Sequence, residues 1–390
     1  LIEKGWTIET YRPETSVAGF IQLPGSGRQV YNFNPGWRFF KGDIRGAESV
    51  DFDDCSWTIV STPHTVELMP AEASGCRNYQ GPAWYRKHFV LPAETKGKQV
   101  LLHFEAAMGK QILYLNGKRI QEHIGGYLPF TLDLTANGVQ AGDSCLLAVF
   151  VDNSNDKSFP PGKPQYTLDF AYHGGIYRDV WMIAKSPVSI TDAIESQTIA
   201  GGGVFVHFDK ISEKSAQVYV NTELQNKDQR SETVTVETAL TDTDGKVIRR
   251  ASGKLSLKPG EKKTIRQQIE IKNPKLWSPD SPYLYRVQSR VKKGNQSIDG
   301  GITRIGIRQA EFRGKDGFWL NGKPFGQLVG ANRHQDFAYV GNALPNSQQW
   351  RDAKRLRDAG CTIIRVAHYP QDPAFMDACD ELGMFVIVAT

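Results

Sequence analysis

Two short polar segments near the C-terminal end of the 390-residue chain carry side chains that can bind ligands and support catalysis. The first holds Asn332, Arg333, His334 and Asp336, and the second is Arg365-Val-Ala-His-Tyr-Pro370. A neutral imidazole donates a hydrogen bond to a hydroxyl or to developing negative charge near neutral pH. A guanidinium holds a carboxylate through two parallel hydrogen bonds. The two segments therefore predict a site that binds a hydroxyl-bearing ligand and orients a carboxylate.

Strands and helices alternate around these two segments and place each one at the end of a strand. Ser347 is a suitable helix N-cap, Gly360 a helix terminator, and Pro373 suits the first turn of the next helix. The last strand is almost wholly apolar, as a parallel strand buried on both faces should be. This order with short loops predicts the start of a parallel α/β fold. In chain order, strands and helices are predicted at 327–332, 347–359, 362–367, 372–382 and 384–389.

The part of the chain before these elements predicts two β-sandwiches. From about 30 to 185, short alternating runs separated by Gly, Asn, Asp and Pro are typical of a jelly roll. Asn116-Gly117 between apolar runs predicts a hairpin with a type I′ turn, because both turn positions favour positive φ. From 187 to about 308 the strands alternate regularly and are rich in Thr, Val, Lys and Glu, which predicts an immunoglobulin-like sandwich.

Composition and charge exclude several classes of protein. No stretch approaches the ~20 consecutive apolar residues of a membrane span, so we expect no membrane partner. The net charge is +5 with scattered Lys and Arg, so we expect no nucleic-acid partner. Five widely spaced cysteines without a Cys-x-x-Cys pair argue against a zinc site and a disulfide framework. Leu1 is not an initiator Met, and the compartment stays open, with a periplasmic or secreted location favoured over a cytoplasmic one.

Six segments in a fixed order carry a resemblance to a known family. The two polar segments are joined by Arg77-Asn-Tyr-Gln-Gly-Pro-Ala-Trp-Tyr-Arg86, Gly125-Gly-Tyr-Leu-Pro-Phe130, Gly174-Gly-Ile-Tyr-Arg-Asp-Val-Trp181 and Leu276-Trp-Ser-Pro-Asp-Ser-Pro-Tyr-Leu-Tyr285. From about residue 31 to 390 the chain resembles glycoside hydrolase family 2, and more narrowly its β-galactosidase branch. The resemblance implies a mainly β, multidomain fold. Its expected parts are a jelly-roll domain over 1–185, an immunoglobulin-like β-sandwich over 186–308 and the first three βα strands of a TIM barrel over 309–390.

The resemblance also assigns roles to individual residues at the mouth of the barrel, where such enzymes bind the terminal sugar. The segments themselves are otherwise expected to be mostly architectural. Ala367 departs from the family, in which a serine is common before His-Tyr-Pro. The expected substrate-binding residues are Asp169, Asn332, His334 and His368, with Arg333 and Arg365 orienting a catalytic glutamate.

Asp169 is the one site residue expected from the jelly roll rather than from the barrel. It lies six residues before Gly175, where β-galactosidases of the family carry an aspartate that contacts the sugar, partly through a bound monovalent cation. We therefore expect a monovalent cation at Asp169, and no cofactor other than a Na or Mg ion in the complete enzyme. The alternative is an Asx-turn aspartate in a Pro- and Gly-rich loop. Asn153 and Asp156 are weaker candidates for the same role.

Retaining glycosidases need two carboxyl groups about 5–5.5 Å apart. In this family both are glutamates, at the ends of barrel strands four and seven, and we count only three strands before Thr390. Both glutamates are therefore expected beyond Thr390, and the chain as given is expected to be inactive. We further expect residues 309–390 to be marginally ordered, or held by docking onto the sandwiches or by self-association into a homo-oligomer.

The leading interpretation is the N-terminal part of a retaining exo-β-glycosidase that hydrolyses terminal non-reducing β-galactosides. A β-glucuronidase or a β-mannosidase of the same family is the first alternative. A second is a non-catalytic carbohydrate-binding module with Tyr79, Trp84 and Tyr127 as its aromatic face. A purely structural β-sandwich assembly is third, and it leaves the polar strand ends without a reason.

Overall fold

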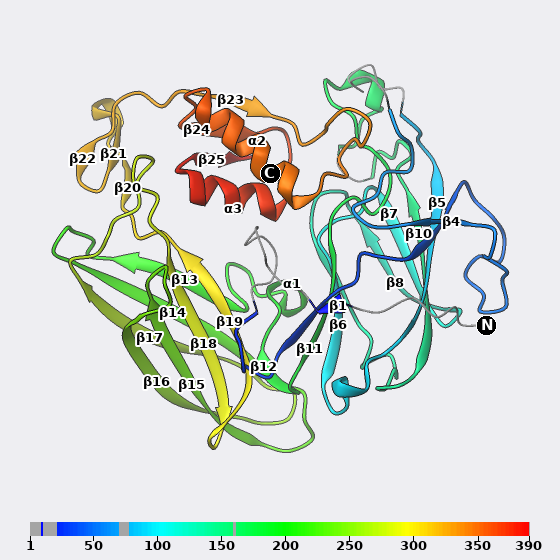
Figure 1. Ribbon diagram of the computed structural model, residues 1–390, viewed down its shortest axis with the longest axis horizontal. Helices are drawn as coiled ribbons and strands as arrows, with labels where there is room; N and C mark the ends of the chain where they lie inside the picture. The colour runs from blue at the N-terminus through cyan, green and yellow to red at the C-terminus, as the bar shows by residue number, and fades with distance from the viewer. Residues whose placement is uncertain (1–8, 11–21, 70–77, 159–160, 390) are drawn as a thin grey trace.

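The computed structural model describes residues 9–10, 22–69, 78–158 and 161–389. Two β-sandwiches lie side by side, and the C-terminal α/β region spans both of them (Figure 1). The expected mainly β, multidomain fold is confirmed. Arg77 of the first family segment lies outside the described residues. No helix among the described residues is long and apolar enough to cross a membrane.

The first sandwich is built from two antiparallel sheets. One has the strand order β1-β2-β11-β6-β9 and the other β4-β3-β5-β10-β7-β8. Apolar residues of both sheets, among them Tyr85, Leu102, Val149 and Met182, are buried in one core between them. The strands are β1 (Glu9–Thr10), β2 (Gln29–Asn32), β3 (Trp37–Lys41), β4 (Thr58–Val60), β5 (Pro82–Val90), β6 (Gln99–Phe104), β7 (Lys110–Leu115), β8 (Lys118–Ile124), β9 (Phe130–Asp133), β10 (Ser144–Asp152) and β11 (Val180–Lys185), with single 3-10 turns η1 (Ala93–Thr95) and η2 (Gln165–Thr167).

The hairpin between β7 and β8 follows the predicted turn chemistry. Leu115 pairs with Lys118 across a two-residue loop. Both loop residues have positive φ, 50° at Asn116 and 80° at Gly117. A type I′ turn requires this at both positions, so the predicted hairpin is confirmed.

The second sandwich pairs a sheet in which β14 is flanked by β12, β13 and β17 with a sheet in the order β16-β15-β18-β19. Val218, Val220, Ile269 and Val287 point inward and form its core. Its strands are β12 (Val188–Ile190), β13 (Val204–Asp209), β14 (Ser215–Asn226), β15 (Glu232–Thr241), β16 (Val247–Leu257), β17 (Lys262–Lys272), β18 (Tyr285–Lys293) and β19 (Gln296–Ile305), and the single-turn helix α1 (Ala193–Ser196) follows β12.

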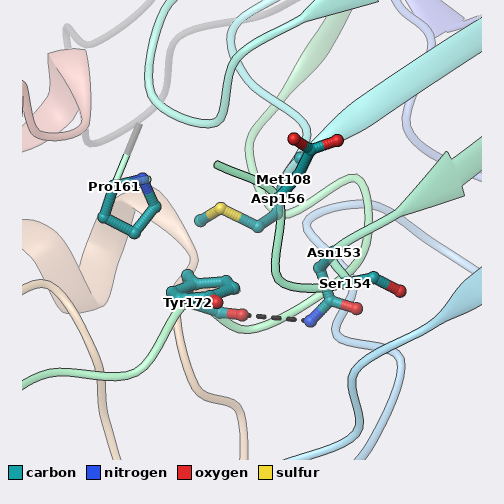
Figure 2. Close-up of a pocket in the computed structure, with 7 residues that line it drawn as sticks. Met108, Asn153, Ser154, Asp156, Pro161 and Tyr172 are labelled. Atoms are coloured by element: carbon teal, nitrogen blue, oxygen red, sulfur yellow. Dashed lines mark hydrogen bonds between the residues drawn. The ribbon is translucent and has the colours of Figure 1, made fainter. Parts of the chain in front are cut away.

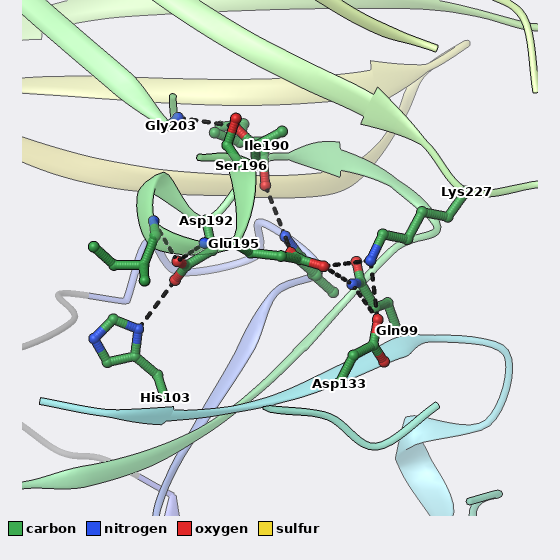
Figure 3. A network of polar contacts seen from close by, with 12 residues as sticks. Gln99, His103, Asp133, Ile190, Asp192, Glu195, Ser196, Gly203 and Lys227 are labelled. Atoms are coloured by element: carbon green, nitrogen blue, oxygen red, sulfur yellow. Dashed lines mark hydrogen bonds and ion pairs between the residues drawn. The ribbon is translucent and has the colours of Figure 1, made fainter. Parts of the chain in front are cut away.

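A polar network fixes the two sandwiches to one another around α1 (Figure 3). Asp192 caps this helix by accepting hydrogen bonds from the backbone N–H groups of Ile194 and Glu195, and its other oxygen contacts His103 on β6. Lys227 of the second sandwich binds Asp133 of the first at 2.9 Å and also pairs with Glu195. These contacts are partly or fully buried, so they help to fix the angle between the two sandwiches.

The C-terminal region begins with a small antiparallel sheet and continues as a parallel α/β unit. The parallel strands lie in the order β23-β24-β25, with Asn332 opposite Arg365 and Arg333 opposite Val366. Its elements are β20 (Ala310–Phe312), η3 (Gly314–Asp316), β21 (Phe318–Leu320), β22 (Lys323–Pro324), β23 (Gly330–Arg333), α2 (Asn346–Asp358), β24 (Ile363–Val366), α3 (Pro373–Leu382) and β25 (Phe385–Val388).

Two local expectations for this region are wrong. Ser347 does not cap α2, because the helix begins one residue earlier, after Pro345, which makes no side-chain cap. The last strand is not buried on both faces: Ile387 is 51% exposed and Val388 is 46% exposed. β25 is one of the two edge strands of the described sheet, so one side of it has no neighbouring strand.

The structure places residues 309–390 against both sandwiches, which is one of the expected arrangements, and self-association stays a prediction. Arg178, two residues before β11, donates to the Gln335 side chain at 2.9 Å and to the Pro370 carbonyl at 2.8 Å. On the other sandwich, Trp277 donates to the Asp380 carbonyl at 2.9 Å, and Arg304 pairs with Asp377 at 2.9 Å. The parallel strands are therefore held from both sides.

Candidate functional site

Three of the expected site residues converge where the first sandwich meets the parallel sheet. Asp169, His334 and His368 bring one carboxylate oxygen and two imidazole nitrogens within 4.8 Å of one another. Nε2 of His368 lies 3.7 Å from a carboxylate oxygen of Asp169, and the two imidazole rings meet edge to face at 5.4 Å between centroids. The Asp169 side chain is 77% exposed, so the cluster opens to solvent.

Strand register explains how the two histidines meet. β23 and β24 are parallel neighbours, and His334 and His368 follow their carboxyl ends. Carboxyl ends of parallel strands share one edge of the sheet, where α/β enzymes place their ligands. Asp169 reaches the same edge on the loop between η2 and β11, and the next residue, Phe170, stacks on the His334 ring with centroids 5.5 Å apart.

Tyr369 is a buried residue that packs against the cluster and was not predicted from the sequence to do so. Its ring is buried and stacks on that of Tyr127 at 4.2 Å and an angle of 5°. Its hydroxyl oxygen lies 3.4 Å from Nδ1 of His334. The sequence did contain an indication of this role. Tyr369 directly follows His368, and the Gly125 to Phe130 segment contains Tyr127, an aromatic residue with which Tyr369 can stack.

The electrostatics favour a neutral His334. Burial lowers the pKa of His334 below its ordinary value, and the nearby carboxylate of Asp336 opposes the shift only in part. At neutral pH the ring therefore carries one proton and offers one N–H donor. That donor suits a hydroxyl group better than a strong anion.

Alternation along the strands decides which of the other expected residues face the site. Ile364 and Val366 of β24 pack against the helices, so Arg365 between them faces the opposite side, toward the interior of the barrel. Asn332 pairs with Arg365 in register and is exposed on that same side. Arg365 donates from one terminal nitrogen to Nδ1 of His368 at 3.0 Å.

Arg333 does not face the barrel mouth, which corrects the expected role. Its partner in the sheet is Val366, so its side chain points toward the helix layer. The buried guanidinium does hold a carboxylate, but that of Asp352 on α2, at 2.7 and 3.0 Å. Its remaining N–H groups bond the side chains of Gln349 and Gln371, and Phe375 lies under it at 4.0 Å. Arg333 therefore fastens the strand to the helices.

Three family models cover most of the chain in the order of the three structural regions. "Glycosyl hydrolases family 2, sugar binding domain" matches residues 47–187, "Glycosyl hydrolases family 2" matches 198–308, and its "TIM barrel domain" matches 312–390. The chain belongs to glycoside hydrolase family 2. Relatives in this family are named β-galactosidase or β-glucuronidase.

A β-galactosidase of Thermoanaerobacter pseudethanolicus is 35% identical over 361 residues, covering 92% of this chain and 46% of its own. A β-glucuronidase of Formosa agariphila is 32% identical over 383 residues, covering 94% of this chain and 38% of its own. The solved structure of a Bacteroides uniformis β-glucuronidase superimposes with a TM-score of 0.82 at 32% identity, covering 92% of this chain and 42% of that one. The chain thus spans less than half the length of these family 2 relatives.

The expected cation at Asp169 would find only one oxygen-donor side chain in the cluster that the described residues form. Na⁺ and Mg²⁺ prefer a shell of oxygen ligands. Around the Asp169 carboxylate the structure places the imidazoles of His334 and His368, which are nitrogen donors. A sodium or magnesium ion therefore stays a prediction for the whole enzyme.

The two weaker candidates of the family 2 site have structural roles. Asn153 is buried, and its amide bonds the backbone of Gly81, Tyr79 and Tyr172 at 2.9 to 3.0 Å. Asp156 is exposed and accepts from the Ser158 backbone at 2.7 Å, as an Asx turn does. A small hollow, partly open to solvent, lies beside them (Figure 2). It is lined by Met108, Gly109, Asn153, Ser154, Asp156, Pro161 and Tyr172.

The aromatic face required by a carbohydrate-binding module is not formed by the residues expected to form it. Trp84 and Tyr127 are both buried, and they belong to different core clusters. Tyr79 uses its hydroxyl to donate to the Pro82 carbonyl at 2.9 Å. Two buried rings and one half-buried ring at separate places cannot form one flat, open platform for a sugar.

Proposed function

We propose that the chain is the amino-terminal part of a retaining exo-β-glycosidase and that Asp169, His334 and His368 bind its terminal sugar. The observation that carries the proposal is their convergence, from three separate segments, at the carboxyl ends of the first two barrel strands. Placement of these side chains from two domains is typical of a binding site at a domain boundary. It is hard to explain as a requirement of packing, because the Asp169 side chain is 77% exposed.

The chemistry of the three groups suits the hydroxyls of a pyranose ring. The Asp169 carboxylate accepts hydrogen bonds, and each imidazole supplies an N–H donor. A sugar hydroxyl both donates and accepts, so it can bridge the carboxylate and an imidazole. Arg365, on the interior face, is close enough to His368 to direct that ring and would also meet a carboxylate entering from another barrel strand.

Hydrolysis itself needs two carboxyl groups with distinct roles. Three acidic residues of the described barrel region are engaged elsewhere. Asp372 is buried and caps α3 through the Ala374 backbone N–H at 2.8 Å, and Asp377 and Glu381 pair with Arg304 of the second sandwich. We therefore propose that the catalytic pair comes from barrel strands outside this chain and that the 390 residues alone do not turn over glycosides.

A terminal β-galactoside is the favoured substrate, and a β-glucuronide is the alternative. The Asn332 to Asp336 segment and the relative named β-galactosidase at 35% identity support the first. Relatives and solved structures named β-glucuronidase at 32% identity support the second. The two sugars differ in configuration at C4 and also at C6, where the glucuronide carries a carboxylate in place of the hydroxymethyl group and so needs a cationic partner.

Equilibrium binding of non-hydrolysable ligands tests this proposal on the chain itself. The thio-analogues of a β-galactoside, a β-glucuronide and a β-mannoside are titrated and followed by saturation-transfer NMR. We expect the galactoside to bind most tightly and none of the matching chromogenic glycosides to be cleaved. Tightest binding of the glucuronide would replace the first specificity with the second. Absence of binding by all three would contradict the proposal, and cleavage of any would place a catalytic pair within the chain.

A further inference from the structure

The contact between Arg365 and His368 determines where the imidazole proton lies. Arg365 approaches Nδ1 of His368 to 3.0 Å. A guanidinium has five N–H donors, no acceptor, and keeps its proton at any ordinary pH. Nδ1 of His368 must therefore be the acceptor, with a free lone pair. In a neutral ring the single proton then lies on Nε2.

Nε2 is the nitrogen that faces Asp169. It lies 3.7 Å from the nearer carboxylate oxygen, which is too long for a direct hydrogen bond. We propose that Arg365 is a positioning residue that fixes His368 as an Nε2–H donor, so that the cluster with Asp169 and His334 binds a hydroxyl and rejects divalent transition metals. The identity of the hydroxyl ligand rests on the proposed function; the tautomer and the rejection of metal do not.

Without Arg365 the same three residues would suit a metal ion. Two imidazoles and a carboxylate with ligand atoms within 4.8 Å match the donors preferred by Zn²⁺, Co²⁺ and Ni²⁺. A metal-bound histidine usually donates its second N–H to a carboxylate or carbonyl, which makes the ligand nitrogen more basic. At His368 the second nitrogen instead receives a hydrogen bond from a cation, which reverses this arrangement. Nε2 then has no lone pair to offer, and the guanidinium repels an incoming cation.

The same arrangement favours a hydroxyl. The gap between Nε2–H and the Asp169 carboxylate has a donor on one side and an acceptor on the other. A hydroxyl group placed against both can accept from His368 and donate to Asp169. Because neither group bonds the other directly, neither has to be released before the ligand binds.

The tautomer can be observed directly on the 390-residue chain labelled with ¹⁵N-histidine. Long-range ¹H–¹⁵N correlation distinguishes a protonated from an unprotonated ring nitrogen, and the signals of His368 are assigned from their loss in His368→Gln. We expect an unprotonated Nδ1 and a protonated Nε2 in the unmodified chain and in Arg365→Lys, which keeps a charged donor. Arg365→Met should lose this preference. A protonated Nδ1 in the unmodified chain would overturn the proposal.

Metal binding gives a second, independent readout. Zn²⁺ is titrated by calorimetry, and Co²⁺ by its visible absorption, into the unmodified chain, Arg365→Met and the control Arg355→Met, which removes an exposed arginine of α2. We expect Arg365→Met to bind Zn²⁺ about 10- to 100-fold more tightly, the usual size of an outer-shell effect. The control should match the unmodified chain, and adding His368→Gln should abolish the gain. Equal Zn²⁺ affinity of folded Arg365→Met and the unmodified chain would overturn the proposal. Neither readout depends on glycosidase activity. The proposal for Arg365 can therefore be contradicted while the proposed function still holds.

Discussion

At the scale of single residues, the direction of one side chain separates binding from support. Arg333 and Arg365 lie on neighbouring parallel strands one register position apart, yet they face opposite sides of the sheet. Arg365 meets His368 at the mouth, whereas Arg333 is buried against Asp352, Gln349 and Gln371 under the helices. Two side chains of the same type therefore have different roles: Arg365 belongs to the site, and Arg333 stabilises the packing of the strand on the helices.

Replacing Arg333 should therefore lower the stability of the C-terminal region and leave the side chains of the site in place. In Arg333→Met the polar groups of Gln349, Gln371 and Asp352 lose their common partner. We expect the free energy of unfolding of the C-terminal region to fall by about 3 kcal/mol, the lower end for a buried ion pair, because Asp352 keeps access to water. Urea unfolding followed by tryptophan fluorescence measures it. Arg355→Met, on the exposed face of α2, should change stability by less than about 0.5 kcal/mol; a similar loss there would contradict the assignment.

At the scale of elements, β23 is the strand on which the site depends, and its contact with β24 is unusually close. A Cβ added at Gly330 would lie 1.7 Å from the carbonyl oxygen of Ile363. The neighbouring backbone cannot move away, because Ile363 is paired on its other side with Phe385 of β25. Glycine is therefore needed at this position for the strands that carry His334 and His368 to lie side by side.

Gly330→Ala should loosen these strands while leaving the sandwiches intact. We expect faster amide exchange in 330–333 and 363–366, corresponding to a local loss of at least about 2 kcal/mol, as overpacking produces. Gly301→Ala on β19, where an added Cβ meets nothing within 4 Å, is the matched control. Unchanged exchange in β23 and β24 of Gly330→Ala would show that the strands do not need this close approach.

The sequence predicted most residues of the site but placed the end of the first barrel strand one residue too early. The two histidines could be predicted to meet because parallel strands end at one edge. The first strand, however, was expected to end at 332, and it includes Arg333. Side chains alternate along a strand, so whether a terminal residue is inside it decides the face on which it lies. Asp169 could be named only from the family resemblance, because periodicity does not predict where a long loop folds.

At the scale of the whole molecule, the joint between the first sandwich and the barrel region holds buried carboxyl groups. Asp179 accepts from Asn34 of the sandwich and Asn346 of α2, both at 2.9 Å. Burial is the main cause that raises the pKa of Asp179 to about 6, and the nearby Asp372 adds to it. Burial also raises the pKa of Asp372 and, well above its ordinary value, that of Glu105. The joint therefore favours protonated carboxyls.

The sign of the resulting pH dependence follows from the folded pKa of Asp179, which lies above its ordinary value of 3.8. Between these two values the folded chain binds more protons than the unfolded chain, so this contribution to stability is full below pH 4 and is lost as the pH rises through 6. We expect the stability of Asp179→Asn relative to the unmodified chain to rise by at most about 3 kcal/mol from pH 4 to pH 7. Urea unfolding at both pH values measures the difference. A constant difference would contradict the raised pKa.

The most direct test of the central claim is the affinity of a β-thiogalactoside for the unmodified chain, Asp169→Asn and Asp156→Asn. Asp169 and Asp156 are both exposed aspartates of the first sandwich, but Asp169 alone of the two lies in the cluster with His334 and His368. We expect Asp169→Asn to weaken binding about 10-fold or more, as loss of a hydrogen bond to a charged group does, and Asp156→Asn to leave it unchanged. Equal affinity of all three proteins would show that the sugar does not bind at this cluster.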